Sequence, residues 1–126
     1  MWKYTSWRQP RTTIYRHTKT NKMKIVKVTY TTKAEYAEQN QSNIKNVMAD
    51  LQNLNHPGIN YNACLTADGK TFIHTAFFKS DDDQKLLNEL PSFKYFQDQL
   101  KSGGLEVPPK QELLNLVGSS NNIFNS

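Results

Sequence analysis

The 126-residue sequence predicts a single α+β domain, and three observations support this prediction. Two runs of alternating β-branched and aromatic residues flank Asp68-Gly69, which is typical of a β-hairpin. Strand-like sequence also stands at residues 24–31 and 111–117, and two stretches with helical spacing of apolar residues lie before and after the hairpin. The order is therefore β-α-β-β-α-β, the ferredoxin-like pattern, with a four-stranded antiparallel sheet and two helices on one face.

Composition and charge exclude several classes of protein. The one cysteine, Cys64, excludes an internal disulfide and fits a reducing compartment such as the cytoplasm. No run approaches the ~20 apolar residues of a membrane span. The net charge of +5 arises in residues 1–22, which hold six basic and no acidic residues, while the remainder holds ten basic and eleven acidic residues. Nucleic-acid binding by the globular part is therefore not expected.

The domain is expected to span residues 23–118, with a basic, disordered extension at 1–22 and a polar tail at 119–126. Three interpretations of the extension remain open. It could be a transit segment, a nucleic-acid arm with aromatic residues among its cations, or an upstream extension without a role.

The hairpin fixes which side chains share a face. A two-residue type I′ turn at Asp68-Gly69 would place Ala63 opposite His74 and Tyr61 opposite Ala76. The other face of the hairpin is more polar, so we expect the first face to lie under the helices. That face carries Ile59, Tyr61, Ala63, Leu65, Phe72, His74, Ala76 and Phe78.

The strand at 24–31 should add Val26, Val28 and Tyr30 to the same face, in the middle of the sheet. Thr32 and Glu35 have the spacing of a capping box, which predicts a helix that ends at 55–58, where proline and glycine follow.

Ser80 should cap the second helical region, which Pro91 should kink or restart at Ser92. The three aspartates at 81–83 are interpreted as part of this cap in preference to a cation site. Residues 105–110 should be a connection, because they contain Pro108-Pro109, and residues 111–117 an edge strand.

The arrangement around Phe78-Lys79-Ser80 and the segment Leu90-Pro91-Ser92-Phe93-Lys94-Tyr95-Phe96 resembles the antibiotic biosynthesis monooxygenase family, over about Met23 to Val117. The resemblance implies a dimeric α+β barrel, in which two subunits form a homodimer through the helix-free faces of their sheets. Some members are cofactor-independent oxygenases of quinols and polyketide phenols, others degrade haem, and many have no assigned activity. Leu87 stands where a histidine is common, so an axial haem ligand is missing.

His74 is the one histidine expected in the interior, and Tyr61 and Tyr30 could reach the space beside it. The hypothesis is that neutral His74 takes a proton from a phenol or quinol, which then passes an electron to dioxygen without a metal or flavin cofactor. The alternative is a core histidine whose nitrogens are simply hydrogen-bonded. The expected pocket residues are Ala63, Leu65, Phe72, Ala76, Phe78, Leu87, Leu90 and Phe93.

Three classes of function remain: a cofactor-independent monooxygenase, a non-catalytic module that binds a small apolar or aromatic ligand, and nucleic-acid binding through residues 1–22 alone. Metal binding is not expected from one cysteine and three scattered histidines.

Overall fold

The structure is a computed structural model that describes residues 23–124. The interpretations of residues 1–22, and the last two residues of the predicted tail, lie outside this range. Among the described residues, no helix is both long and apolar enough to span a membrane. The elements in chain order are β1 (Lys24–Thr32), a 3₁₀ helix (Ala34–Tyr36), α1 (Ala37–Leu54), β2 (Ile59–Leu65), β3 (Thr71–Phe78), α2 (Asp81–Glu89), α3 (Pro91–Gln99), a π-type turn (Leu100–Gly104) and β4 (Leu105–Leu114).

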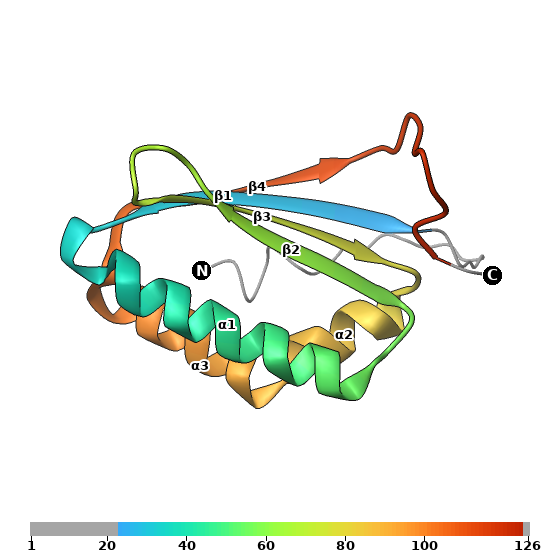
Figure 1. Ribbon diagram of the computed structural model, residues 1–126, viewed down its shortest axis with the longest axis horizontal. Coiled ribbons are helices and arrows are strands. Elements are labelled where there is room, and N and C mark those ends of the chain that lie inside the picture. The colour runs from blue at the N-terminus through green and yellow to red at the C-terminus, as the bar shows by residue number, and fades with distance from the viewer. Residues whose placement is uncertain (1–22, 125–126) are drawn as a thin grey trace.

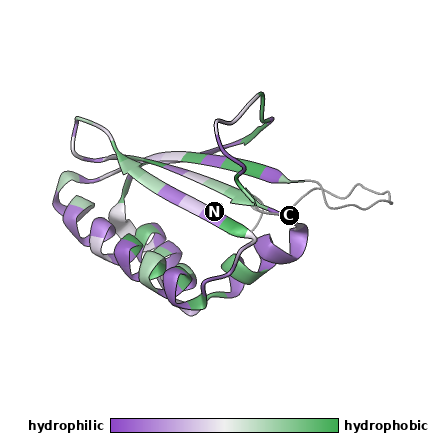
Figure 2. Ribbon diagram, turned by 45° about the vertical axis from the view of Figure 1, so that its right-hand side comes forward, coloured by the Kyte–Doolittle hydropathy of each residue, from purple (hydrophilic) through white to green (hydrophobic). Residues whose placement is uncertain are grey.

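One antiparallel sheet and one layer of helices form the fold, with α1, α2 and α3 on the same face of the sheet (Figure 1). The strand order is β2-β3-β1-β4, so β1 and β3 lie in the middle. In Figure 2, α1 and α3 each carry both hydrophilic and hydrophobic residues, as expected for helices with one side on a sheet and the other in solvent. The predicted ferredoxin-like class and the central position of the first and third strands are confirmed.

β2 and β3 pair in the predicted register, with Ala63 opposite His74 and Tyr61 opposite Ala76. The predicted type I′ turn is wrong, because it needs positive φ at both central residues and only Gly69, with φ +80°, has it. The loop is longer, residues 67–70, and a backbone bond of 2.9 Å from Thr66 to Thr71 closes it. These two residues remain opposite each other, so the register of the strands is unchanged.

The side chain of Asp68 explains this loop. Its Oδ1 accepts hydrogen bonds from the backbone N–H groups of Lys70 and Thr71, at 2.9 and 2.8 Å, and from the hydroxyl of Thr66 at 2.8 Å. A carboxylate that binds nearby backbone donors stabilises a turn without a left-handed residue at its own position.

The core lies between the sheet and the helices. Val26, Val28 and Tyr30 are buried and join the face that carries His74, as predicted. Full burial of an apolar side chain contributes about 1.5–3 kcal/mol, so this layer is the main source of stability. The buried apolar residues of this layer are Val26, Val28, Tyr30, Ala37, Ile44, Val47, Phe72, Ala76, Phe78, Leu87, Phe93, Phe96 and Leu100.

The predicted capping box is wrong. Thr32 is the last residue of β1, and its hydroxyl donates to the carbonyl of Lys70 at 3.4 Å instead of binding a helix terminus. The backbone N–H of Lys33 bonds the carbonyl of Gly104 at 2.8 Å, and a 3₁₀ turn leads into α1. The end of the helix is as predicted, with Asn55 in the left-handed conformation, φ 48°.

The second helical region divides at Pro91, one residue before the predicted restart. Ser80 caps α2 as predicted, since its hydroxyl oxygen accepts from the backbone N–H of Asp83 at 3.4 Å. Leu90 has an extended conformation, and Pro91 is the first residue of α3, where its missing N–H costs no helical hydrogen bond.

The final strand begins earlier than predicted, because Leu105–Leu114 pairs with β1 through Pro108-Pro109. The register shifts between Thr29 and Thr31 of β1, opposite the two prolines. An edge strand tolerates proline at such a bulge, since its outward N–H groups have no neighbouring strand to bind.

We predict that Gly58→Ala destabilises the protein by about 1–3 kcal/mol. A Cβ at residue 58 would overlap the carboxylate of Asp83, which cannot move freely because it binds the His56 ring and the Ser80 hydroxyl, at 2.5 and 2.9 Å. Urea unfolding measures the change. Gly118→Ala, where a Cβ meets open space, is the control and should change stability by no more than about 0.5 kcal/mol.

Candidate functional site

Three adjacent strands, β2, β3 and β1, bring together the three residues predicted to act at the site. His74 on β3 lies opposite Val28 on β1 and Ala63 on β2. Both of these partners are smaller than the imidazole and leave room beside it. Tyr30 and Tyr61 therefore reach the ring diagonally, from opposite sides.

Both ring nitrogens of His74 bind a tyrosine hydroxyl. Nε2 lies 2.8 Å from the Tyr30 oxygen, and Nδ1 lies 2.6 Å from the Tyr61 oxygen. Asn40 on α1 donates from Nδ2 to the Tyr30 oxygen at 2.8 Å. We call these four residues the His74 network. It joins the helical layer to the edge strand β2 through the centre of the sheet.

Asn40 was missed by sequence reasoning. A signal for it exists, because residue 40 lies three positions after Ala37 and four before Ile44, both of which are buried on α1. A polar residue within an apolar helical stripe must find a buried partner, and its partner here is Tyr30.

Aromatic rings hold the imidazole in place. His74 stacks on Phe96 of α3, with ring centroids 5.4 Å apart, and Tyr61 meets Phe93 edge-on at 6.1 Å. His74 and Phe96 are both fully buried. The ring therefore has no direct access to solvent.

Burial determines the protonation of the site. It lowers the pKa of His74 to about 3, so the imidazole is neutral at pH 7. Burial also raises the pKa of Tyr61 well above its ordinary value. The pKa of Tyr30 is raised by the same cause, against the opposing effect of the hydrogen bond from Asn40. All three groups are thus uncharged in the folded protein at neutral pH.

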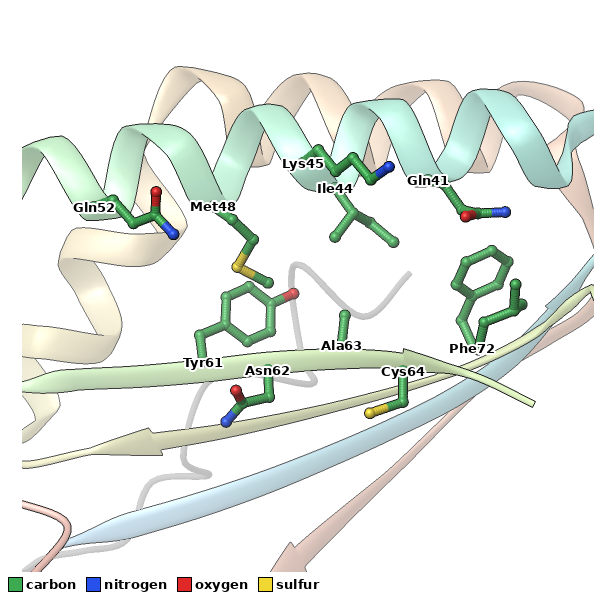
Figure 3. Close-up of a pocket in the computed structure, with 11 residues that line it drawn as sticks. Gln41, Ile44, Lys45, Met48, Gln52, Tyr61, Asn62, Ala63, Cys64 and Phe72 are labelled. Atoms are coloured by element: carbon green, nitrogen blue, oxygen red, sulfur yellow. The ribbon is translucent and has the colours of Figure 1, made fainter. Parts of the chain in front are cut away.

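A cavity of about 370 Å³ lies beside this network, between α1 and β2, and we call it the α1–β2 groove. Figure 3 shows Tyr61, Ala63 and Phe72 pointing from the sheet toward Ile44 and Met48 of α1. Tyr61 is the one member of the His74 network that lines the groove. The groove is lined by Gln41, Ile44, Lys45, Met48, Gln52, Tyr61, Asn62, Ala63, Cys64, Leu65 and Phe72.

The groove lies nearer the sheet edge than the pocket expected from the sequence. Three of the expected pocket residues, Ala63, Leu65 and Phe72, line it. His74 and Tyr30 lie behind Tyr61 and do not line the groove. The other expected pocket residues belong to the core or pack against it, because the aromatic rings of α3 fill the space there. They are Ala76, Phe78, Leu87, Leu90 and Phe93.

Other types of site have little support in residues 23–124. No group of three His, Cys, Asp or Glu side chains in that range could hold a metal ion. The aspartates at the start of α2 are engaged locally, since Asp81 lies 2.7 Å from Lys24 and Asp83 binds His56. The side chain of Cys64 points to the opposite face of the sheet from Tyr61 (Figure 3).

These features define a ferredoxin-like domain with a neutral, buried His74 network and a groove of mixed apolar and polar lining at the edge of its sheet. No protein-family model matches the sequence, and no curated protein matches it at the sequence level.

Solved structures share the fold. One described as a "putative antibiotic biosynthesis monooxygenase" from Nitrosomonas europaea is 16% identical with a TM-score of 0.65, over 80% of this chain and 96% of that chain. Another with the same description, from Caulobacter crescentus, is 18% identical with a TM-score of 0.66, over 78% and 92%. A conserved protein from Methanosarcina mazei is 12% identical with a TM-score of 0.63, over 75% and 92%. The fold is therefore that of antibiotic biosynthesis monooxygenase-like structures, as the resemblance in the sequence implied.

Burial of His74 predicts a loss of stability in mild acid. The pKa of a histidine in an unfolded chain is about 6.5, whereas the pKa of His74 in the folded protein is about 3. Between these values the unfolded chain binds a proton that the folded protein does not, so the free energy of unfolding falls as the pH drops. At pH 5 this residue should account for a loss of about 2 kcal/mol.

Urea unfolding between about pH 7 and pH 4 tests this expectation. The variant His74→Gln cannot titrate and should show a weaker pH dependence than the parent protein. His56→Gln is the control. It keeps His74, so its free energy of unfolding should still show the pH dependence that His74 causes. Equal slopes for the parent and His74→Gln would contradict a buried neutral imidazole.

Proposed function

We propose that the protein is a cofactor-independent monooxygenase that binds a small aromatic, quinol-type substrate in the α1–β2 groove. The observation that carries this proposal is the position of Tyr61, which lines the groove and whose hydroxyl lies 2.6 Å from Nδ1 of buried His74. The same fold occurs in structures described as putative antibiotic biosynthesis monooxygenases, which supports the reaction class.

The chemistry of the groove suits an aromatic ligand that carries an oxygen atom. Ile44, Met48 and Phe72 form apolar walls, and Lys45 adds an ammonium group at the α1 side. None of the eleven described residues that line the groove has a carboxylate. A positive group without an opposing negative one favours a phenolate over a phenol, so binding lowers the pKa of the substrate hydroxyl. The volume of about 370 Å³ lies in the range of small-molecule sites, about 300–1,000 Å³.

The reaction balances without a bound cofactor because the substrate is itself the reductant. A phenolate passes one electron to dioxygen, and the resulting superoxide and phenoxyl radical combine into a peroxide at a ring carbon. Loss of the ring proton with cleavage of the O–O bond leaves a quinone and releases water. One oxygen atom of dioxygen enters the product, and the other leaves as water.

The roles of the predicted catalytic residues follow from their positions. Tyr61 is the residue that would touch the substrate. His74 and Tyr30 act through Tyr61 as positioning residues, because the imidazole is buried and both its nitrogens bind tyrosine. Direct proton abstraction by His74 would also be opposed by its lowered pKa.

A second candidate is a module that binds the same class of ligand without turnover. Burial of His74 favours it, since no histidine or carboxylate side chain is among the described residues that line the groove and could act there as a base. Both candidates predict a ligand beside Tyr61, and they differ in whether oxygen is consumed.

Oxygen consumption with 1-naphthol separates these candidates. The monooxygenase should consume one dioxygen for each 1,4-naphthoquinone formed, and Tyr61→Phe should lower the rate about 100-fold through the loss of one hydrogen-bonding group. Asn46→Ala is the control, because Asn46 lies on the exposed side of α1 and does not line the groove, and it should keep the rate. A raised melting temperature with 1-naphthol but no oxygen uptake would favour the binding module. If 1-naphthol causes neither oxygen uptake nor a raised melting temperature, the proposed ligand site in the groove is refuted.

The proposed assembly is a homodimer through the helix-free face of the sheet, in a reducing compartment such as the cytoplasm. Ile73 and Phe77 on β3 point to this face and are half-buried, and Leu114 on β4 is exposed. Apolar residues on an open sheet face gain free energy when a second copy covers them.

Ile73→Asp should convert the dimer to a monomer, because it buries two unpaired carboxylates at the twofold contact. Sedimentation velocity at micromolar concentration measures the oligomeric state. Asn46→Asp, on the exposed side of α1, is the matched control and should leave the dimer intact. A monomeric parent protein would contradict the proposed assembly.

A further inference from the structure

The hydrogen bonds of the His74 network can run in two directions. A neutral imidazole has one N–H donor and one acceptor nitrogen, and each of its nitrogens here lies against a tyrosine hydroxyl. Either Nδ1 donates to Tyr61 while Nε2 accepts from Tyr30, or both bonds are reversed. The two arrangements present different groups to the α1–β2 groove.

We propose that Asn40 fixes the direction of the network, so that Tyr61 presents a hydrogen-bond donor to the groove. Asn40 donates Nδ2–H to the Tyr30 oxygen at 2.8 Å. A hydroxyl that accepts a hydrogen bond becomes a better donor, because each bond in a chain polarises the next. Tyr30 therefore donates its hydrogen to Nε2 of His74.

The proton on the imidazole then belongs to Nδ1. Nδ1–H donates to the Tyr61 oxygen at 2.6 Å, which leaves the hydrogen of the Tyr61 hydroxyl for a ligand. This inference rests on the proposed function only in taking the α1–β2 groove as the ligand site.

The ligand class follows from this direction. A donor at Tyr61 and an ammonium group at Lys45 both complement an oxygen that accepts hydrogen bonds. A quinone carbonyl or a phenolate satisfies them, whereas a neutral phenol that approached as a donor would meet the Tyr61 hydrogen. The groove therefore selects aromatic ligands with a carbonyl or anionic oxygen.

Asn40 is a positioning residue that never touches the ligand. It is fully buried on α1, and its Oδ1 has no hydrogen-bond partner among the described residues. Among the described residues, the amide of Asn40 thus has its hydrogen bond with Tyr30. A side chain at position 40 that accepted a hydrogen bond would take the hydrogen of the Tyr30 hydroxyl. The hydrogen bonds from Tyr30 to His74 and from His74 to Tyr61 would then both reverse direction.

Nuclear magnetic resonance of ¹⁵N-histidine protein tests the direction without any ligand or turnover. Two-bond ¹⁵N–¹H correlations distinguish the Nδ1–H tautomer of a neutral imidazole from the Nε2–H tautomer. We expect Nδ1–H for His74 in the full chain. The Nε2–H tautomer would overturn the proposal, and this result does not depend on whether a variant folds.

Asn40→Asp places an acceptor at the start of the network and should switch His74 to the Nε2–H tautomer. Asn43→Asp is the matched control on the same helix, because Asn43 is buried but binds Tyr36 instead of Tyr30. It should leave the tautomer unchanged. A switch in both variants, or in neither folded variant, would contradict a specific role for Asn40.

Binding of 1,4-naphthoquinone, which can only accept hydrogen bonds, tests the ligand class. The measurement uses the Cys64→Ser background, because quinones alkylate exposed thiols. Asn40→Asp and Tyr61→Phe should each weaken binding about tenfold, as expected for the loss of one hydrogen bond. Unchanged affinity in both would refute the ligand class. Absence of oxygen uptake would refute the monooxygenase alone and leave the tautomer and the binding result standing.

Discussion

The fold depends on one constraint, the burial of a polar imidazole in the centre of the sheet. A buried polar group without partners costs several kcal/mol, so a histidine at position 74 is tolerated only where both nitrogens are bonded. Those bonds come from β1 and β2, the two neighbours of β3. A shift of either strand by one residue would turn its tyrosine to the other face, so His74 also specifies the register.

The parts of the fold that could be predicted from the sequence depend on alternation along the strands. Period-two patterning identified the face that carries His74, and the Asp68-Gly69 dipeptide located the hairpin, although the loop itself differs. The predicted register is correct although the predicted turn type is wrong, because Thr66 and Thr71 lie opposite each other in both cases. Tyr30 and Tyr61 could be assigned to His74 for the same reason.

The rest depends on side-chain volumes and partners distant in sequence. Phe93 and Phe96 fill the space beside His74, so the cavity opens between α1 and β2 and not directly at His74, where the sequence suggested it. Asn40 was not identified from the sequence, because its partner Tyr30 lies on a different element, ten residues earlier in the chain. The β4 prolines were interpreted as a connection because the sequence does not show the bulge between β1 and β4 at which an edge strand can continue through proline.

Asp68 in the hairpin loop and His74 in the interior respond to acid at different pH values. Hydrogen bonds from Thr71, Lys70 and Thr66 hold the pKa of the Asp68 carboxyl well below the usual range. A carboxylate with a lowered pKa stays charged in the folded protein until the pH falls well below the pKa of an ordinary aspartate. As the pH falls, the unfavourable effect of protonating His74 should therefore begin before the hydrogen bonds that Asp68 accepts in this loop are weakened.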